Sequence, residues 1–228
     1  MTTIDSINKL RGKVTSVAKK YKSILSIYVY AGFLYNTKNF KDIDLLILLK
    51  NSENPELLLS KLDSELRSSI KEKIDTNYVF QNELNRNLAG QKSNFYYTYI
   101  YRTGRLLYGK DSLGKTEPSK EELYRWIVLL AQRARHFYYN GLETVFWVPK
   151  FKKWTIYALA ETYYHQRLDN NKIKADLRIM AKEFIVKNEN FKEGQLLFQN
   201  YPINAKYYLT FLEKLRIFIE IEILKIPQ

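Results

Sequence analysis

Short apolar runs separated by polar loops dominate the first half of the chain. Residues 24–31 and 43–49 are compact runs of bulky apolar side chains, which are typical of strands buried within a sheet. Residues 74–80 form a third such run, and residues 105–108 form a short fourth one that Gly109 closes. The pattern therefore predicts a small β-sheet in this half of the molecule.

Helical spacing appears between these runs. Apolar side chains recur every three or four residues over residues 3–21, which predicts an amphipathic helix. A second helix is expected to begin at Asn54 and Pro55, and its buried stripe is expected to consist of Leu57, Leu58, Leu62 and Leu66. The segment 83–103 is ambiguous, because its aromatic run FYYTYIY favours a strand by propensity, whereas a helix running into Arg102 fits it too.

The composition changes at residues 109–120, where Gly, Ser, Pro and Lys predominate, and this segment is predicted to be a linker. Beyond it the apolar residues follow helical periodicity, which predicts four helices at about 119–140, 150–168, 172–188 and 204–225. The expected fold class is therefore α+β. A domain over residues 1–110 would contain a small mixed β-sheet, and an all-α helical bundle domain would follow over residues 119–228.

The composition narrows the possible chemistry. The chain has 228 residues, 46% of them hydrophobic, which is enough to bury a core. It contains no cysteine, which excludes disulfides, thiolate metal sites and cysteine nucleophiles, and its two histidines exclude a histidine-rich metal site. We expect a cytoplasmic protein without membrane contact, because no apolar run is long enough to span a bilayer and no signal-peptide pattern opens the chain.

The chain is basic, with 37 Lys and Arg against 24 Asp and Glu, and the resulting net charge of +13 is spread over both halves. Such a balance suits a polyanionic partner, for example a nucleoside triphosphate or RNA. A lysine-rich, solvated surface without a specific anionic partner would give the same composition. The sequence gives no indication of the oligomeric state.

Two aspartates open the second apolar run. Asp42 and Asp44 are two residues apart, so in a strand their carboxylates project from the same face. Two like charges at this distance repel each other unless a cation lies between them, and divalent ions such as Mg²⁺ prefer oxygen ligands of this kind. Asp75, at the start of the next run, could complete a triad and act as a base toward an attacking hydroxyl. Alternatively, these residues are ordinary acidic side chains at the exposed end of a sheet.

The order of these residues resembles the pattern of the nucleotidyltransferase superfamily of the DNA polymerase beta type. Gly32 and Phe33 follow the first apolar run, Asp-Ile-Asp at 42–44 opens the second, and Asp75 lies in the third. The sequence GRLLYGKD, residues 104–111, is similar to an element that often closes such domains. The helical remainder resembles the C-terminal helical domains fused to them, including those of the HEPN and kanamycin-nucleotidyltransferase types.

This resemblance implies a small mixed sheet that binds a nucleoside triphosphate together with magnesium, with two ions expected. Asp42, Asp44 and Asp75 would be the catalytic and metal-binding residues, and Asp75 would also assist the attacking hydroxyl. A nucleoside monophosphate would be transferred to a hydroxyl of an RNA end, a protein or a small molecule, and pyrophosphate would be released.

The sequence departs from the superfamily pattern beside Gly32. Phe33 stands where the family has a serine whose hydroxyl helps to hold the terminal phosphates, and Lys41 replaces a small polar residue. The backbone N–H groups of residues 32–34 and the Lys41 ammonium could take over this contact, so Gly32, Phe33 and Lys41 are predicted nucleotide-binding residues. The alternative is a non-catalytic nucleotide- or nucleic-acid-binding protein whose site has degenerated at Phe33.

Three further cations are candidates for binding the nucleotide. Arg105 opens the fourth apolar run, close to the expected active edge, and Lys152 and Lys153 lie at the start of the second helix of the predicted bundle. If the bundle faces that edge, these side chains could receive a triphosphate or an RNA backbone. Solvated lysines beside a helical core are the alternative.

Overall fold

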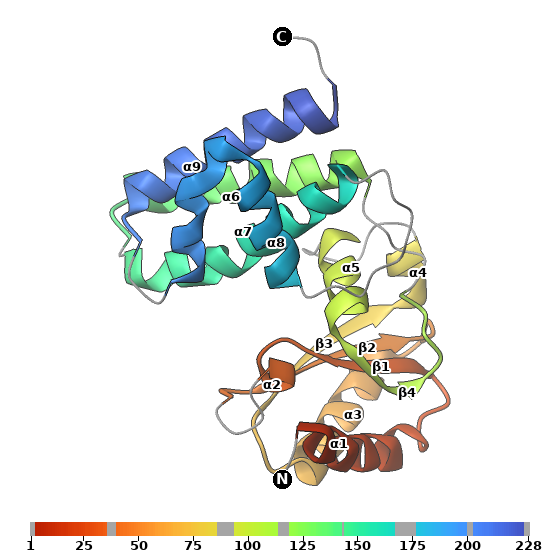
Figure 1. The fold of residues 1–228 in the computed structure, drawn as a ribbon. Coiled ribbons are helices and arrows are strands. Elements are labelled where there is room, and N and C mark those ends of the chain that lie inside the picture. Colours follow the sequence, from red (N-terminus) through yellow and green to blue (C-terminus); the bar gives the residue numbers. More distant parts are fainter. Residues whose placement is uncertain are drawn as a thin grey trace. The chain divides into compact units, whose positions relative to one another are not determined.

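The computed structural model describes residues 3–35, 40–85, 94–113, 119–142, 144–166, 177–199 and 203–225. The chain divides into two compact units, Met1–Glu117 and Pro118–Gln228, which are described one at a time (Figure 1). The predicted domains, residues 1–110 and 119–228, stay a prediction of which parts fold independently. Residues 114–118 of the predicted linker lie outside the described residues.

A mixed sheet of four strands, in the order β3-β2-β1-β4, forms the centre of the first unit. β1 (Ile24–Tyr30) is antiparallel to both β2 (Ile43–Leu49) and β4 (Arg105–Gly109), and β2 is parallel to β3 (Ile74–Phe80). These strands confirm the prediction of a small mixed sheet from the apolar runs. The first strand ends one residue earlier than expected, and the fourth includes Gly109.

Helices α1 (Thr3–Ala18) and α3 (Pro55–Ser69) cover one face of this sheet (Figure 1). Alternate strand residues point to the same face, and those directed toward α1 and α3 form the main core of the unit. Among the core residues from the strands are Ile27, Val29, Ile43, Leu45, Ile47 and Ile74.

The prediction of Leu57 as a buried residue of α3 is wrong, because its side chain is 51% exposed. At about 100° per residue, Leu57 lies on the opposite side of the helix from Leu66. Leu62 and Leu66 are buried, and Leu58 packs against the core while remaining partly exposed.

The aromatic segment at the end of the ambiguous region is a helix, α5 (Asn94–Thr103), and not the strand that propensity favours. It lies on the sheet face opposite α1 and α3 (Figure 1). Residues 96–100, which include Thr98, are all buried, so this part of the helix is enclosed on every side. Gly104 ends the helix by donating its N–H to the Ile100 carbonyl at 2.7 Å. Tertiary packing around the whole segment therefore outweighs the strand preference of aromatic residues.

Two short helices follow the strands on either side of β2. α2 (Gly32–Tyr35) comes after β1, and α4 (Gln81–Asn85) comes after β3. Residues 36–39 and 86–93 lie outside the described residues.

The second unit is helical, which together with the sheet of the first unit confirms the predicted α+β class. It contains α6 (Lys120–Tyr139), α7 (Thr144–Gln166), α8 (Leu177–Lys187) and α9 (Ala205–Phe218), which ends in the π-helical turn η2 (Ile219–Ile223). The 3₁₀ segment η1 (Glu189–Phe198) was not predicted. Residues 167–176, which include the end of the second predicted helix and the start of the third, lie outside the described residues.

Among the helices in the described part of the chain, none combines the length and the apolar character needed to cross a membrane.

Candidate active site

Two of the predicted carboxylates lie side by side on neighbouring strands. Asp44 of β2 is in register with Asp75 of β3 on one side and with Tyr30 of β1 on the other. In-register residues project from the same face, so these three side chains form a row across three strands, which is called the aspartate row. Asp42 comes directly before β2, two residues ahead of Asp44, at the same end of the strand. The predicted convergence of the acidic side chains is therefore supported by the strand register.

The row faces away from the main core. The neighbours of Asp44 in sequence, Ile43 and Leu45, are buried among the side chains of α1 and α3. Because side chains alternate along a strand, Asp44 and Asp75 project from the other face, which is the one that carries α5. Asp42 and Asp44 are partly exposed and Asp75 is exposed, so solvent and a ligand can reach this end of the sheet.

A network of hydroxyl and amide groups lies beside the row. The Tyr30 hydroxyl accepts a hydrogen bond from Asn77 Nδ2 at 2.8 Å, and it is also hydrogen-bonded to the Tyr96 hydroxyl. The Tyr30 and Tyr96 rings meet edge to face, with their centroids 5.9 Å apart. Both side chains are almost fully buried. The network links β1, β3 and α5 on the face that carries the aspartates.

The charges of the aspartates act on both phenols. Burial raises the pKa of Tyr30 far above its usual value, and the neighbouring Tyr96 and the carboxylates of Asp44 and Asp75 raise it further. Burial likewise raises the pKa of Tyr96, and Asp44 and Asp75 add to this effect. Both phenols therefore keep their protons at neutral pH and serve as hydrogen-bonding groups.

The Phe33 side chain belongs to the core and not to the aspartate row. It is 4% exposed, and its ring meets the Phe40 ring edge to face at 5.0 Å. With Leu10 and Ile43 it borders a small cavity of about 230 Å³ on the α1 side of the sheet. The ring leaves the row open, and only the backbone of Phe33 is available for the predicted nucleotide contact.

The junction between β1 and α2 has an unusual backbone. Ala31, and not the adjacent glycine, has a positive φ of 60°. An ideal Cβ built on Gly32 would meet no atom within 4 Å. The left-handed conformation disfavours residues with a Cβ, so sterics would favour glycine at position 31 rather than at position 32.

No family model matches the chain, and its sequence matches no curated protein. Among solved structures, spectinomycin adenyltransferase AAD(9) from Enterococcus faecialis, with ATP and spectinomycin, aligns with a TM-score of 0.53 at 14% identity. The alignment covers 96% of this chain and 100% of that chain. The fold of this chain is therefore similar to the fold of that adenyltransferase. A structure of the MntA–HpeT toxin–antitoxin pair also aligns, over 58% of this chain and 98% of that one, with 14% identity and a TM-score of 0.36.

Arg105 is not brought to the aspartate row. It is in register with Val29, whose side chain lies in the core formed with α1 and α3. Arg105 therefore projects from the face opposite Asp44, on the edge strand β4. Lys41 is exposed and directly precedes Asp42, so it stays a candidate for a phosphate contact.

Lys152 and Lys153 belong to α7 of the second unit, and their assignment to the nucleotide stays a prediction. Lys152 donates a hydrogen bond to the Gln199 carbonyl, and its pKa is lowered by burial and by the nearby charge of Arg178. The Lys153 ammonium lies 5.4 Å from the centroid of the Trp154 ring, within the range of a cation–π contact.

The aspartate row offers carboxylate oxygens as ligands for magnesium. Among the residues that the structure describes, no group of three or more acidic, histidine or cysteine side chains could hold a metal ion by itself. Mg²⁺ is commonly bound by one or two carboxylates together with substrate phosphates. The in-register pair Asp44 and Asp75, with Asp42 next to it, offers oxygen donors of this kind. The residues therefore fit a magnesium ion that binds together with a nucleotide.

The sequence interpretation did not include Tyr30, Asn77 and Tyr96 in the site. A signal for two of them is present in the strand period. Tyr30 ends the first strand, and Asn77 is two residues from Asp75, so both belong to the face that carries the carboxylates. Tyr96 could not be found in this way, because the sequence did not determine whether its segment is a strand or a helix.

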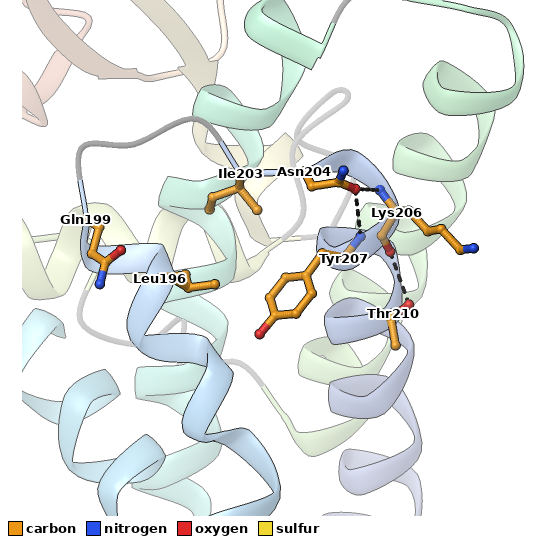
Figure 2. A pocket seen from close by; sticks show the side chains of 7 residues that line it. All are labelled: Leu196, Gln199, Ile203, Asn204, Lys206, Tyr207 and Thr210. Carbon is orange, nitrogen blue, oxygen red and sulfur yellow. Dashed lines mark hydrogen bonds between the residues drawn. The ribbon is translucent and has the colours of Figure 1, made fainter.

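Another cavity lies in the second unit (Figure 2). It has a volume of about 540 Å³ and is lined by Leu196, Gln199, Ile203, Asn204, Lys206, Tyr207 and Thr210. The Asn204 side chain accepts hydrogen bonds from the backbone N–H groups of Lys206 and Tyr207 and so caps α9. None of these lining residues carries a carboxylate, so this cavity offers no counterpart of the aspartate row.

Proposed function

We propose that the chain is a magnesium-dependent nucleotidyltransferase, which moves a nucleoside monophosphate from a nucleoside triphosphate to a hydroxyl acceptor. The observation that carries this proposal is the in-register pair Asp44 and Asp75, with Asp42 beside it, at an accessible end of a sheet with the nucleotidyltransferase fold. A triphosphate as the donor agrees with the ATP named in the structure of AAD(9), which has a similar fold.

The three carboxylates would have different roles, which depend on their positions. Asp42 and Asp44 would hold the magnesium ions, with Asp75 as an additional ligand, because their oxygens are the donors that this ion prefers. When bound, magnesium orients the phosphates and offsets the negative charge that develops on them. Gly32 and Lys41, which flank the segment between β1 and β2, would contact the phosphates through a backbone N–H and an ammonium group.

The transfer itself is a substitution at the α-phosphorus. The acceptor oxygen forms a bond to this phosphorus, and the bond from phosphorus to the oxygen that bridges the α- and β-phosphates breaks. Pyrophosphate leaves, and the hydroxyl proton passes to the carboxylate of Asp75. Asp75 suits this role because it is the most exposed of the three aspartates and can be approached by an acceptor from solution.

The acceptor is a hydroxyl of an RNA end, a protein or a small molecule. The net charge of +13 favours RNA among these, since a basic surface attracts the phosphate backbone and raises its local concentration. A protein or small-molecule acceptor would depend on contacts that charge alone does not specify.

A second candidate function rests on Phe33. The residue that replaces the family serine is buried in the core, so no side-chain hydroxyl is available there for the terminal phosphates. The chain would then be a non-catalytic protein that binds a nucleotide or nucleic acid on the same face without transferring a group.

Labelled triphosphates separate the two candidates. The protein is incubated with Mg²⁺, each α-³²P-labelled triphosphate and a total cell extract, and the RNA, protein and small-molecule fractions are counted. Asp44→Asn should lower transfer about a hundredfold or more. Glu53→Gln, which changes an exposed carboxylate in the loop after β2, should leave transfer unchanged.

The outcome of a parallel thermal-shift assay decides the remaining cases. Transfer that depends on Asp44 supports the enzyme. A magnesium–nucleotide shift in melting temperature without any transfer supports the binding protein. Absence of both transfer and shift with every triphosphate would contradict both candidates.

A further inference from the structure

The side chain of Tyr30 crosses the strand that carries Asp44. Tyr30 is on β1 and its hydrogen-bond partner Asn77 is on β3, with β2 between them. Tyr30 is in register with Asp44, whereas Asn77 is in register with Leu46. The Tyr30 side chain therefore runs diagonally over β2, from the position of Asp44 to the position of Leu46. The phenol lies on the same sheet face as the Asp44 side chain, on the side of it that is farther from the strand end.

This position matters because the two carboxylates repel each other. Asp44 and Asp75 are on neighbouring strands, and like charges in register are unfavourable. Repulsion alone would favour rotamers that turn the carboxylates apart, and one of these directions is inward, along the sheet. The Tyr30 ring closes that direction for Asp44. The hydrogen bond to Asn77 connects Tyr30 to the face of β3 that also carries Asp75, two residues away.

Helix α5, which lies on the same sheet face, holds this arrangement in place. The Tyr96 hydroxyl is bonded to the Tyr30 hydroxyl, and both side chains are buried, with 6% and 2% exposure. A buried tyrosine that has lost a partner would leave a polar group unsatisfied, which makes the bonded arrangement the favoured one. Three elements, β1, β3 and α5, are thereby connected around the carboxylates.

We propose that Tyr30 is a positioning residue that directs the carboxylates of Asp44 and Asp75 toward the outer end of the strands for a divalent cation. It acts through the ring that lies over β2 and through its bonds to Asn77 and Tyr96. This inference rests on the proposed function, since it assigns Tyr30 to the magnesium site of that reaction. Groups that orient metal ligands commonly contribute about ten- to a hundredfold to metal affinity.

Tyr28 provides a matched control on the same strand and the same face. It is also buried, at 3% exposure, but its hydroxyl is bonded to Asp111 Oδ1 at 2.9 Å and to the Ser112 N–H at 2.8 Å. These partners follow β4 and have no part in the aspartate row. Tyr28→Phe and Tyr30→Phe each remove one buried hydroxyl with two partners, so a purely structural role predicts similar effects for both.

The test measures Mn²⁺ binding to the full-length chain through the EPR signal of the free ion, with and without α,β-methylene ATP. Urea unfolding of each variant is measured in parallel. Both variants should lose similar stability, but only Tyr30→Phe should weaken Mn²⁺ binding, by about tenfold or more. If Tyr30→Phe does not fold, Asn77→Ala, which removes the bond from the more exposed end, should give the same weakening.

The possible results separate the positioning role of Tyr30 from the proposed function. If the Tyr30 variant, or the Asn77 variant in its place, binds Mn²⁺ within twofold of Tyr28→Phe, the positioning role is wrong while the proposed function stands. If the wild type binds no Mn²⁺ under either condition, both the inference and the magnesium-dependent function are wrong. Weakening in Tyr30→Phe alone supports the inference.

Discussion

Replacing Asp75 by asparagine is expected to stabilise the metal-free protein although it removes a proposed catalytic group. Asp75 and Asp44 are in register on neighbouring strands, so their charges oppose each other when no cation is bound. Asparagine has nearly the same shape and keeps a hydrogen-bonding side chain, and Asp75 is exposed, so little packing is lost. The free energy of unfolding should therefore rise.

The size of the effect follows from the strand spacing. Two unit charges about 4.8 Å apart, the distance between neighbouring strands, repel by about 0.9 kcal/mol at the dielectric constant of water. Asp75 also attracts a cation: Asp63 is the main cause of the raised pKa of Arg67, and the charge of Asp75 contributes to it. This attraction offsets part of the gain. We expect Asp75→Asn to raise the free energy of unfolding by about 0.5 kcal/mol.

Urea unfolding in the presence of EDTA measures this change as a shift of the midpoint at constant slope. Glu53→Gln removes a carboxylate that is exposed in the loop after β2, and it raises the net charge of the basic chain equally. It should be neutral or slightly destabilising. The gain for Asp75→Asn should also shrink in high salt, because exposed charges are screened.

The reverse effect is expected when ligands are present. Magnesium and a triphosphate should stabilise the wild type and should stabilise Asp75→Asn much less, since a ligand that binds only the native state adds about 2.7 kcal/mol at a hundred times its Kd. A lower midpoint for Asp75→Asn than for Glu53→Gln in EDTA would refute the reasoning. It would mean that the two carboxylates do not oppose each other on this face.

Four further substitutions test the junction after β1, the end of α5 and the start of α6. Gly32→Ala should change the free energy of unfolding by less than about 0.5 kcal/mol but weaken magnesium–triphosphate binding severalfold, as measured by urea unfolding and by thermal shift. Gly104→Ala should lower the free energy of unfolding by about 1 to 3 kcal/mol, because its Cβ would lie 2.5 Å from a carbonyl oxygen. Ala31→Gly should stabilise the protein by about 0.5 to 1 kcal/mol, because it relieves a left-handed backbone. Ser119→Ala should lower the free energy of unfolding by about 1 kcal/mol, because the capping box of α6 is lost. A midpoint that moves in the opposite direction would contradict the account of that position.

The sheet and its carboxylates could be predicted because their signals are local. The runs at 43–49 and 74–80 are bulky and apolar and are bounded by polar residues, so their extent was predicted correctly. The spacing of Asp42 and Asp44 placed them at one end of a strand by strand period alone. The parallel pairing that brings Asp75 into register with Asp44 needed the superfamily resemblance, because sequence spacing does not determine which strands are neighbours.

Other features depend on tertiary packing and could not be predicted in this way. The aromatic residues of α5 favour strands as isolated residues, but the packing that buries residues 96–100 on all sides of the helix outweighs this preference. Nothing in the sequence indicates which side of the sheet Phe33 enters. The bond between Tyr30 and Asn77 likewise depends on the strand order, since it crosses a third strand.

The junction at Ala31 and Gly32 shows how fold and function can be separated at neighbouring residues. Ala31 is buried with a positive φ, so the fold alone would favour glycine there, whereas a Cβ on Gly32 would meet nothing within 4 Å. Phe33 secures the segment in the core and leaves Gly32 exposed. Packing within the chain therefore gives no reason for glycine at position 32, whereas the proposed approach of a phosphate to its backbone would give one. Unchanged triphosphate binding in Gly32→Ala would remove that reason and would leave the nucleotide contact to Lys41 and the aspartates.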